Sequence, residues 1–278
     1  MKNLLIYGWM CVMAAFLTGC GRQVEIIAHR GASYDAPENT LAAVNLAWRQ
    51  GFDVEVDIHL SADKRIVVIH DKDTKRTAGR KLVVAETASD ELRKLDVGSF
   101  KSQDFAGERM PFLEEVLETI PPHRKLYVEI KSGPETVDVL VPVLLDSGRL
   151  PQIVIIGFDL ETVALAKQRL PQTPVYWLKG TDKHKVTNHP IPHDTSLIRT
   201  AQDKNLDGLD VHYAGVTEEF ANAVRASNLG LYVWTVDDLA EAQRLVSLKV
   251  DGITTNRPAW LSEQLAATRN KTSRNHKD

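Results

Sequence analysis

The chain has 278 residues, of which 43% are hydrophobic and 26% charged, and its 34 basic and 37 acidic side chains give a net charge of −3. This composition excludes a collagen-like, coiled-coil or mostly disordered chain, and the length suits one large domain or two small ones. The sequence has no basic run to favour a nucleic-acid partner, and its two cysteines exclude a disulfide scaffold.

The first predicted element is a secretory signal at residues 1–19. Lys2 precedes an apolar stretch that is too short for a membrane span. The stretch ends in Leu17-Thr18-Gly19-Cys20, which resembles a bacterial lipobox, where Cys20 is diacylated and becomes the mature N-terminus. An ordinary signal peptide with a chance cysteine is the alternative. The lipobox predicts export and a lipid anchor in a bacterial membrane, and the glycine after it favours the outer membrane if the cell is Gram-negative.

From residue 20 to 268, short β-branched runs alternate with amphipathic stretches. Eight strands, each followed by a helix, in about 250 residues predict a TIM (β/α)8 barrel. A doubly wound sheet would also alternate, but it has no reason to stop at eight strands, and no glycine-rich dinucleotide motif follows any of them. The expected strands are Ile26–His29, Asp53–Ile58, Leu126–Ile130, Ile153–Gly157, Val175–Leu178, Gly208–Val211, Leu231–Thr235 and Gly252–Thr255. The expected helices are Thr40–Gln50, Phe112–Ile120, Glu135–Asp146, Leu160–Leu170, Thr195–Lys204, Thr217–Ser227, Leu239–Lys249 and Pro258–Ala266.

Two segments interrupt this alternation. Arg65–His70 is expected to be an extra strand folded back beside the second barrel strand, and residues 71–110 after it have no strong period and form an insertion. Residues 179–194 form a second, polar loop. The last ten residues, 269–278, are expected to be a disordered tail.

Three acidic residues lie where a TIM barrel carries its chemistry, near the carboxyl ends of the strands. Glu55 and Asp57 are spaced by two and therefore point to the same side of their strand, and Glu129 lies on the next barrel strand. Three convergent carboxylates need a compensating charge, because an unpaired buried ion costs several kcal/mol. The all-oxygen donor set predicts one Mg²⁺ or Ca²⁺ rather than zinc. The alternative is that each acid pairs with a nearby Lys or Arg.

Histidines and basic residues also end the predicted strands. His29 and His70 are candidates for proton transfer because imidazole titrates near neutral pH, although either could be a structural histidine. Arg30 and Lys131 offer positive charge for a phosphate, or ion pairs with neighbouring acids. The loop 179–194 carries three more histidines that could imitate a zinc site, but a mobile lid fits better because no regular element fixes them. They are His184, His189 and His193.

A set of short motifs runs across nearly the whole mature chain. They are His29-Arg30-Gly31, Pro37-Glu38-Asn39-Thr40, Glu55-x-Asp57, His70-Asp71, Val97-Gly98-Ser99-Phe100, Met110-Pro111-Phe112-Leu113-Glu114-Glu115-Val116-Leu117, Val128-Glu129-Ile130-Lys131, Val233-Trp234-Thr235-Val236 and Gly252-Ile253-Thr254-Thr255-Asn256. In order and spacing, this set resembles the glycerophosphodiester phosphodiesterase family. The resemblance implies a TIM barrel with an insertion, and hydrolysis of deacylated phospholipids to sn-glycerol 3-phosphate and an alcohol.

The resemblance also implies residue roles. It leaves open which histidine is the acid, and whether water or the glycerol 2-hydroxyl attacks first. His59 has no fixed counterpart in the family, and Glu38 is expected to open the first helix rather than to bind metal. Two alternatives remain: a lysophospholipase D-like or other phosphodiesterase, and a non-catalytic lipoprotein that binds a glycerophosphoryl ligand. The implied roles are the acid/base pair for His29 and His70, ligands of Mg²⁺ or Ca²⁺ for Glu55, Asp57 and Glu129, phosphate binding for Arg30 and Lys131, and the substrate mouth for Trp234.

Overall fold

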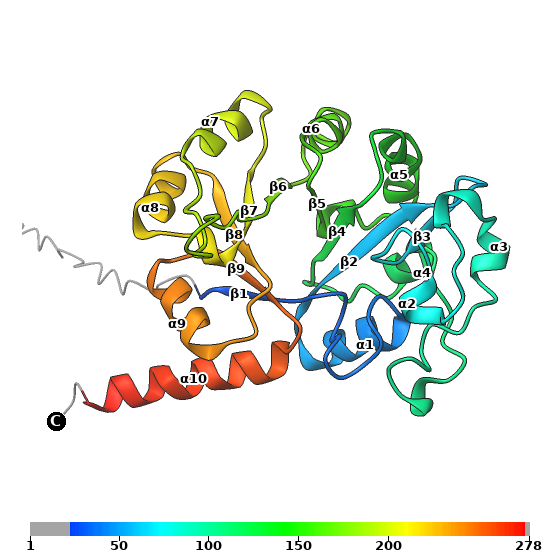
Figure 1. The fold of residues 1–278 in the computed structure, drawn as a ribbon, viewed down its shortest axis with the longest axis horizontal. Helices are drawn as coiled ribbons and strands as arrows, with labels where there is room; N and C mark the ends of the chain where they lie inside the picture. Colours follow the sequence, from blue (N-terminus) through cyan, green and yellow to red (C-terminus); the bar gives the residue numbers. More distant parts are fainter. Residues whose placement is uncertain (1–22, 276–278) are drawn as a thin grey trace, which may run out of the picture.

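Eight parallel strands close into a barrel in the computed structural model, which describes residues 23–275, with side chains to residue 269. The barrel closes at β1 (Glu25–Ala28), which pairs with β2 (Asp53–Leu60) on one side and β9 (Gly252–Thr255) on the other. Helices surround the barrel (Figure 1), so the predicted TIM barrel is confirmed. The other barrel strands, in sheet order from β2, are β4 (Leu126–Ile130), β5 (Ile153–Gly157), β6 (Val175–Lys179), β7 (Gly208–His212) and β8 (Gly230–Trp234).

The helices between the strands lie within two residues of their predicted bounds, except for the last. Several begin at a threonine or aspartate whose side chain accepts a hydrogen bond from a backbone N–H of the first turn, as Thr40 does from Ala43. The helices are α1 (Leu41–Gln50), α4 (Leu113–Glu118), α5 (Glu135–Asp146), α6 (Leu160–Arg169), α7 (Ser196–Asp203), α8 (Glu218–Ala226), α9 (Leu239–Ser247) and α10 (Pro258–Asn275).

The carboxyl-terminal segment differs from the prediction. Helix α10 continues nine residues past the expected end at Ala266, through most of the segment 269–278 that was expected to be disordered. The reason is visible in the sequence, because no proline or glycine follows Pro258 to end the helix. None of the described helices is long and apolar enough to span a bilayer. The predicted signal at 1–19 and Cys20 lie outside the described residues.

The insertion 71–110 follows the extra strand β3 (Ile66–Val68), which pairs antiparallel with β2 as predicted. The insertion has more structure than its lack of periodicity suggested. Its helices are single turns, too short to produce a 3.6-residue pattern, and they enclose a small apolar core around Leu92 and Met110. They are α2 (Lys75–Ala78), η1 (Val84–Glu86), α3 (Ser89–Leu92) and η2 (Gln103–Phe105).

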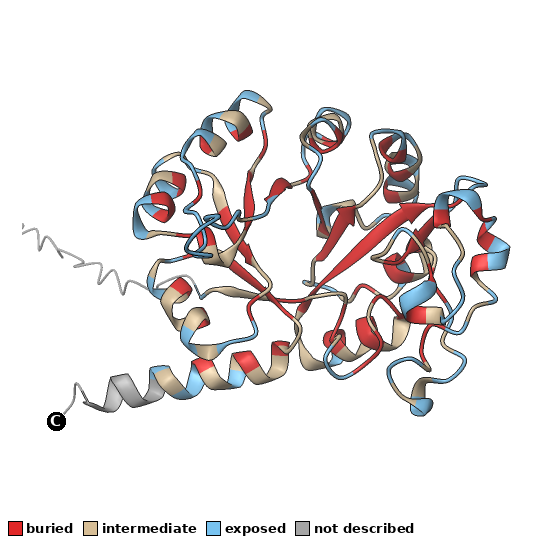
Figure 2. Cartoon of the chain, in the orientation of Figure 1, coloured by how far each residue is buried: buried red, intermediate tan, exposed pale blue. Residues whose placement is uncertain are grey.

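The two faces of the barrel strands differ in chemistry. Outward-facing aliphatic residues pack against the helices and form the main core, which appears as the buried strands and inner helix faces in Figure 2. Inside the barrel, aromatic side chains fill the amino-terminal end, where Tyr127 and Tyr232 donate hydrogen bonds of 2.9 and 3.1 Å to Glu25. Gly252 makes room for them, because a Cβ there would overlap the Tyr232 ring. The interior is therefore closed at one end, and the polar residues gather at the other.

Candidate active site

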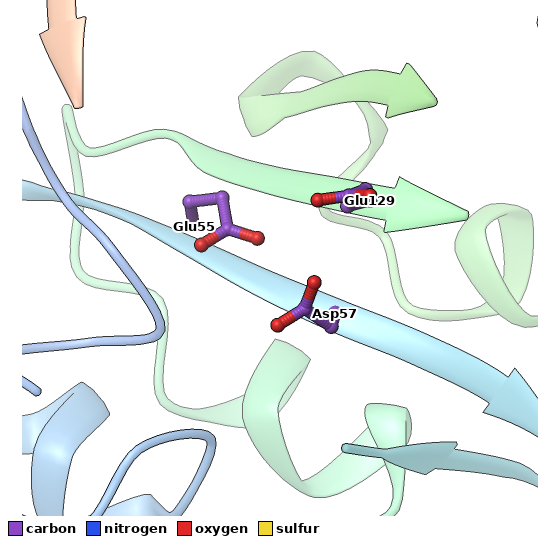
Figure 3. Close-up of side chains that lie close together, drawn as sticks. All are labelled: Glu55, Asp57 and Glu129. Atoms are coloured by element: carbon purple, nitrogen blue, oxygen red, sulfur yellow. The ribbon is translucent and has the colours of Figure 1, made fainter. Parts of the chain in front are cut away.

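Three carboxylates converge at the carboxyl end of the barrel. Glu55 and Asp57 alternate along β2 with aliphatic residues and so point inward, and Glu129 stands directly opposite Asp57 on β4. One oxygen of each carboxylate lies within 4.8 Å of the others, and all three residues are buried. Figure 3 shows the three carboxylates turned toward one another. The structure therefore brings together the acids that the sequence singled out.

Burial and mutual repulsion dominate the electrostatics of this cluster. Burial, with the charges of Asp57 and Glu129, raises the pKa of Glu55 well above its usual range. Burial and the charge of Asp57 raise the pKa of Glu129 to about 7. Burial also raises the pKa of Asp57, but the positive charges of Arg30 and Lys131 outweigh it, and the net pKa is lowered. The cluster thus lacks enough positive charge to hold three carboxylates ionised at neutral pH.

The donor set fits a divalent cation. Within residues 23–269, no hydrogen-bond donor reaches Glu55 Oε1 or Asp57 Oδ1, although both oxygens are buried. Lys131 Nζ lies 3.5 Å from Asp57 Oδ1 and 2.8 Å from Glu129 Oε1, which compensates part of the negative charge. Orphaned carboxylate oxygens in a buried, all-oxygen cluster are suitable ligands for Mg²⁺ or Ca²⁺.

Arg30 is held above the cluster by an unusual backbone. Its φ of 54° is in the left-handed region, and it is followed by Gly31 at φ 76°, where a Cβ would lie 2.5 Å from a backbone carbon of Ala43. This conformation turns the Arg30 N–H toward Glu55 Oε2 at 2.8 Å and places its Nε 3.2 Å from Asp57 Oδ2. The His-Arg-Gly motif therefore needs its glycine to bring Arg30 to the acids.

The hydrogen bonds of His29 define which ring nitrogen carries its proton. Its Nδ1 lies 2.7 Å from Asn256 Oδ1, and the Asn256 amide N–H₂ donates to Asp237 Oδ2 at 2.6 Å, which fixes the amide orientation. His29 Nδ1 therefore donates, and Nε2 keeps its lone pair. Burial and the adjacent Arg30 guanidinium lower the pKa of His29 to about 4, so the imidazole is neutral at physiological pH.

His70 is supported by a charged network from the insertion. Its Nδ1 donates to Asp71 Oδ1 at 2.7 Å, and Asp71 Oδ2 accepts from Arg76 Nε at 2.7 Å. Arg76 also makes two hydrogen bonds to Glu38, which in turn accepts from Arg30 Nη1 at 2.8 Å. The Arg76 and His70 contacts lower the pKa of Asp71 to about 2. A continuous chain of ion pairs thus links His70 to Arg30.

The structure gives Glu38 a role other than the one expected from the sequence, and it gives His59 a role where none was predicted. Glu38 was expected to open the first helix, but that helix has Thr40 as its N-cap, and Glu38 instead pairs with arginines. His59, whose role was open, is buried and bridges two elements: Nε2 lies 3.1 Å from the His70 carbonyl oxygen and Nδ1 lies 3.2 Å from Ser132 Oγ. His59 therefore braces the backbone that carries His70.

A cavity of about 130 Å³ lies at the centre of these groups. Charged and apolar side chains both line it, and Trp234 is one of the apolar ones. Phe158 stands at its rim, edge-on to Trp234 with ring centroids 5.4 Å apart. The cavity is lined by His29, Arg30, Glu55, His70, Glu129, Lys131, Ile156, Phe158, Leu178, Asp210, Trp234, Thr235 and Thr254.

The loop histidines do not join this site. His184 and His189 are exposed, whereas His193 is buried with its Nε2 2.8 Å from the His212 carbonyl oxygen. Among the described residues, the acidic triad is the one group that could hold a metal through three such side chains, so the zinc alternative finds no support there.

Three supporting residues had no role in the sequence analysis. Asn39 clamps Asp57, donating from Nδ2 to Oδ2 at 2.8 Å and accepting from the Asp57 backbone N–H. Asn256 orients His29, and Arg76 connects the insertion to the barrel. Membership of Asn39 and Asn256 in the motifs was the available signal. Arg76 lies in no motif, and its spacing from other residues gave no signal of a role.

The comparisons with known proteins agree with this site. The profile of the Glycerophosphoryl diester phosphodiesterase family matches residues 29–260. The chain belongs to this family. A glycerophosphodiester phosphodiesterase from Caldanaerobacter subterraneus subsp. tengcongensis is 31% identical over 242 residues, covering 85% of this chain and 95% of the relative. This chain therefore has the family's activity, hydrolysis of glycerophosphodiesters, which confirms the predicted enzyme class. The family depends on a divalent metal, and the acidic triad of this chain could hold one.

Solved structures share the barrel. An Oleispira antarctica phosphodiesterase in complex with the product sn-glycerol-3-phosphate matches with a TM-score of 0.78 at 27% identity, covering 87% of this chain and 96% of that one. A glycerophosphodiester phosphodiesterase from Agrobacterium tumefaciens matches with a TM-score of 0.72 at 25% identity, covering 87% and 100%. The predicted family and fold are thus supported by both sequence and structure.

Proposed function

We propose that this phosphodiesterase cleaves water-soluble glycerophosphodiesters to sn-glycerol 3-phosphate and an alcohol, with one Mg²⁺ or Ca²⁺ held by Glu55, Asp57 and Glu129. One observation carries the proposal: two of these acids, Glu55 and Glu129, line a single cavity together with two cationic side chains and two histidines, and Asp57 completes the acidic cluster behind them. When bound, the cation supplies Lewis-acid stabilisation of the negative charge that develops on the phosphoryl oxygens. The Oleispira relative, which holds the product, supports the same substrate class.

Arg30 and Lys131 bind the phosphoryl group. Both line the cavity, and both already touch the acidic cluster, with Arg30 Nε 3.2 Å from Asp57 and Lys131 Nζ 2.8 Å from Glu129. Arg30 can present two N–H groups in a fixed plane, while Lys131 acts as a point charge. Their fixed position lets them stabilise the charge of a transition state without reorganisation of solvent.

The hydrogen bonds around the two histidines favour different roles. His29 is neutral, and the bond from its Nδ1 to Asn256 leaves Nε2 free to accept a proton from the attacking hydroxyl or water. His70 donates from Nδ1 to Asp71 Oδ1 at 2.7 Å, and this carboxylate orients the ring at the cavity. We therefore assign His29 as the general base and His70 as the acid that protonates the leaving alkoxide.

Export and lipid anchoring at Cys20 remain part of the proposal, and the barrel limits how an anchor would orient it. Strand β1 begins at Glu25, and five extended residues reach at most about 17 Å. The amino end of β1 lies opposite the carboxyl end where the cavity opens. An anchor at Cys20 would therefore hold the closed end of the barrel against the bilayer and leave the mouth facing water. This orientation favours a soluble diester over a lysophospholipid embedded in the membrane.

The test is a substrate and metal panel on purified protein. After chelation, Mg²⁺ or Ca²⁺ should restore turnover of glycerophosphocholine, glycerophosphoethanolamine and bis-glycerophosphate, but not of lysophosphatidylcholine in vesicles. His29→Ala and His70→Ala should each lower kcat by about 10²–10⁴-fold, with no rescue by metal. Glu129→Gln should bind the cation more weakly and regain part of its rate in excess metal.

The matched control is His184→Ala, since His184 is exposed on the loop 179–194 and does not line the cavity. Its kcat should equal that of the wild type. Turnover of the lysophospholipid alone would instead identify a lysophospholipase D-like enzyme. Binding of glycerophosphodiesters without turnover under any metal would identify a non-catalytic receptor.

A further inference from the structure

Asp210 is a buried acid that lines the cavity but has no role in the proposed mechanism. It lies on β7 with 1% of its surface exposed, and it lines the same cavity as Glu129 and Lys131. Its backbone neighbours in the sheet are Leu178 on β6 and Tyr232 on β8, neither of which carries a charge that could pair with it.

The Asp210 carboxyl has no structural partner that explains its burial. Within the described residues, no hydrogen-bond donor reaches Oδ1. Trp234 Nε1 donates to the Asp210 backbone oxygen at 3.1 Å, a bond that any residue at this position would keep. Buried polar groups in folded proteins are nearly always hydrogen-bonded, because an unsatisfied one costs about 1–3 kcal/mol. A lasting unsatisfied carboxyl in the wall of a binding cavity indicates a ligand that satisfies it.

The residues around Asp210 indicate which part of the substrate lies beside its carboxyl. Arg30 and Lys131 line the cavity and are proposed to bind the phosphoryl group, and a carboxylate beside that anion would repel it. The larger alcohol group has an open exit at the rim, where 45% of the Phe158 surface is exposed. Asp210 and its sheet neighbour Leu178 are both buried where they line the cavity, which favours a small uncharged polar group there over a bulky or anionic one. Burial and repulsion by Glu129 raise the pKa of Asp210 well above its usual range, which favours the uncharged carboxyl, a group that can both donate and accept a hydrogen bond.

We propose that Asp210 is a specificity-determining residue that hydrogen-bonds a hydroxyl group of the substrate's glycerol moiety. The inference rests on the proposed function, because it assumes a glycerophosphoryl ligand in this cavity. It makes Asp210 and the buried Leu178 beside it the glycerol-binding part of the cavity. A diester without such a hydroxyl would leave Asp210 unsatisfied in the complex and would therefore bind more weakly.

The experiment compares two ligands that differ only in hydroxyl groups. The affinities of sn-glycerol 3-phosphate and propyl phosphate are measured by calorimetry on the metal-loaded full-length protein and on Asp210→Asn and Asp210→Leu. The wild type should prefer sn-glycerol 3-phosphate by about 10- to 100-fold. Asp210→Leu should abolish that preference while propyl phosphate binds within about threefold of the wild type. Asp210→Asn, which still hydrogen-bonds, should keep part of the preference.

A thermal unfolding series separates this role from a structural one. Because Asp210 has an unsatisfied buried carboxyl, Asp210→Leu and Asp210→Asn should unfold at or above the wild-type temperature. Equal affinity of the wild type for both ligands, or a preference that survives Asp210→Leu, would overturn the inference. So would a loss shared equally by both ligands. Absence of diester turnover by the wild type would instead contradict the proposed function, and the binding ratio would still decide the role of Asp210.

Discussion

Loss of the proton from Glu129 should destabilise the metal-free protein as the pH rises. Burial and Asp57 raise the pKa of Glu129 from 4.5 to about 7, so the folded state holds a proton that the unfolded chain releases near pH 4.5. A raised pKa contributes stability that is fully present below the unfolded value and is lost as the pH rises through the folded value. In the chelated protein, this contribution should therefore disappear between about pH 4.5 and 7.

The size of the effect follows from the pKa. At 1.36 kcal/mol for each pH unit, a rise from 4.5 to about 7 corresponds to about 3 kcal/mol of unfolding free energy. For a protein of this length, that equals about 6–12 °C in Tm. Other groups titrate in the same range, so the quantity to follow is the difference between the wild type and Glu129→Gln, which has no proton to lose. A bound cation takes the place of the proton and should reverse the trend.

Two measurements check this linkage. Thermal unfolding in chelator at several pH values should show the wild type losing stability relative to Glu129→Gln as the pH rises. Calorimetric titration should show a cation Kd about tenfold larger at pH 6 than at pH 8, with proton release at pH 7. A pH-independent difference between the two proteins, together with a constant Kd from pH 6 to 8, would refute the assignment of Glu129 as a ligand that exchanges a proton for the metal.

Three further predictions test other parts of the chain. Arg76→Ala removes the link between Glu38 and Asp71 and should lower kcat/KM for glycerophosphocholine by about 2- to 5-fold, a modest effect because Arg76 is partly exposed. An unchanged kcat/KM in steady-state kinetics would show that this network does not support catalysis. Gly252→Ala forces a methyl group against the Tyr232 ring and should lower the free energy of unfolding by about 1–3 kcal/mol, measured in urea. An unchanged free energy of unfolding would show that the ring shifts without cost. Cys20→Ser should move the protein from membranes to the soluble exported fraction with its activity intact; continued membrane association would exclude the lipid anchor.

The barrel was predictable because its strands and helices are short, regular and repeated. Each β-branched run is buried on both faces, and most helices have a capping threonine or aspartate before them, so both ends of the elements are marked in the sequence. The insertion was not predictable in detail, because single-turn helices such as Lys75–Ala78 are too short to show a period. Helix α10 was predicted too short, because the polar composition of 269–275 was taken as a sign of disorder.

The acids and histidines of the site were predictable for a different reason. An inward-facing acid on a strand that is otherwise aliphatic, such as Asp57 on β2, has no structural explanation and therefore indicates chemistry. Residues that act through another residue carry no such signal. Asn256 orients His29 across 227 positions of sequence, and Arg76 reaches Glu38 across 38, so only the closed barrel shows these contacts.

The two ends of the barrel differ in the partners that they offer to inward-facing acids. At the amino end, Glu25 accepts hydrogen bonds from two tyrosine hydroxyls and pairs with Lys125, and these partners outweigh its burial and lower its pKa. At the carboxyl end, burial raises the pKa of Glu55 and Asp210, and each has an oxygen that no donor within the described residues reaches. The same fold can therefore satisfy an inward-facing acid with its own side chains, as it does at Glu25. Where it does not, the missing partners are supplied from outside: a cation for Glu55 and, by our inference, a substrate hydroxyl for Asp210.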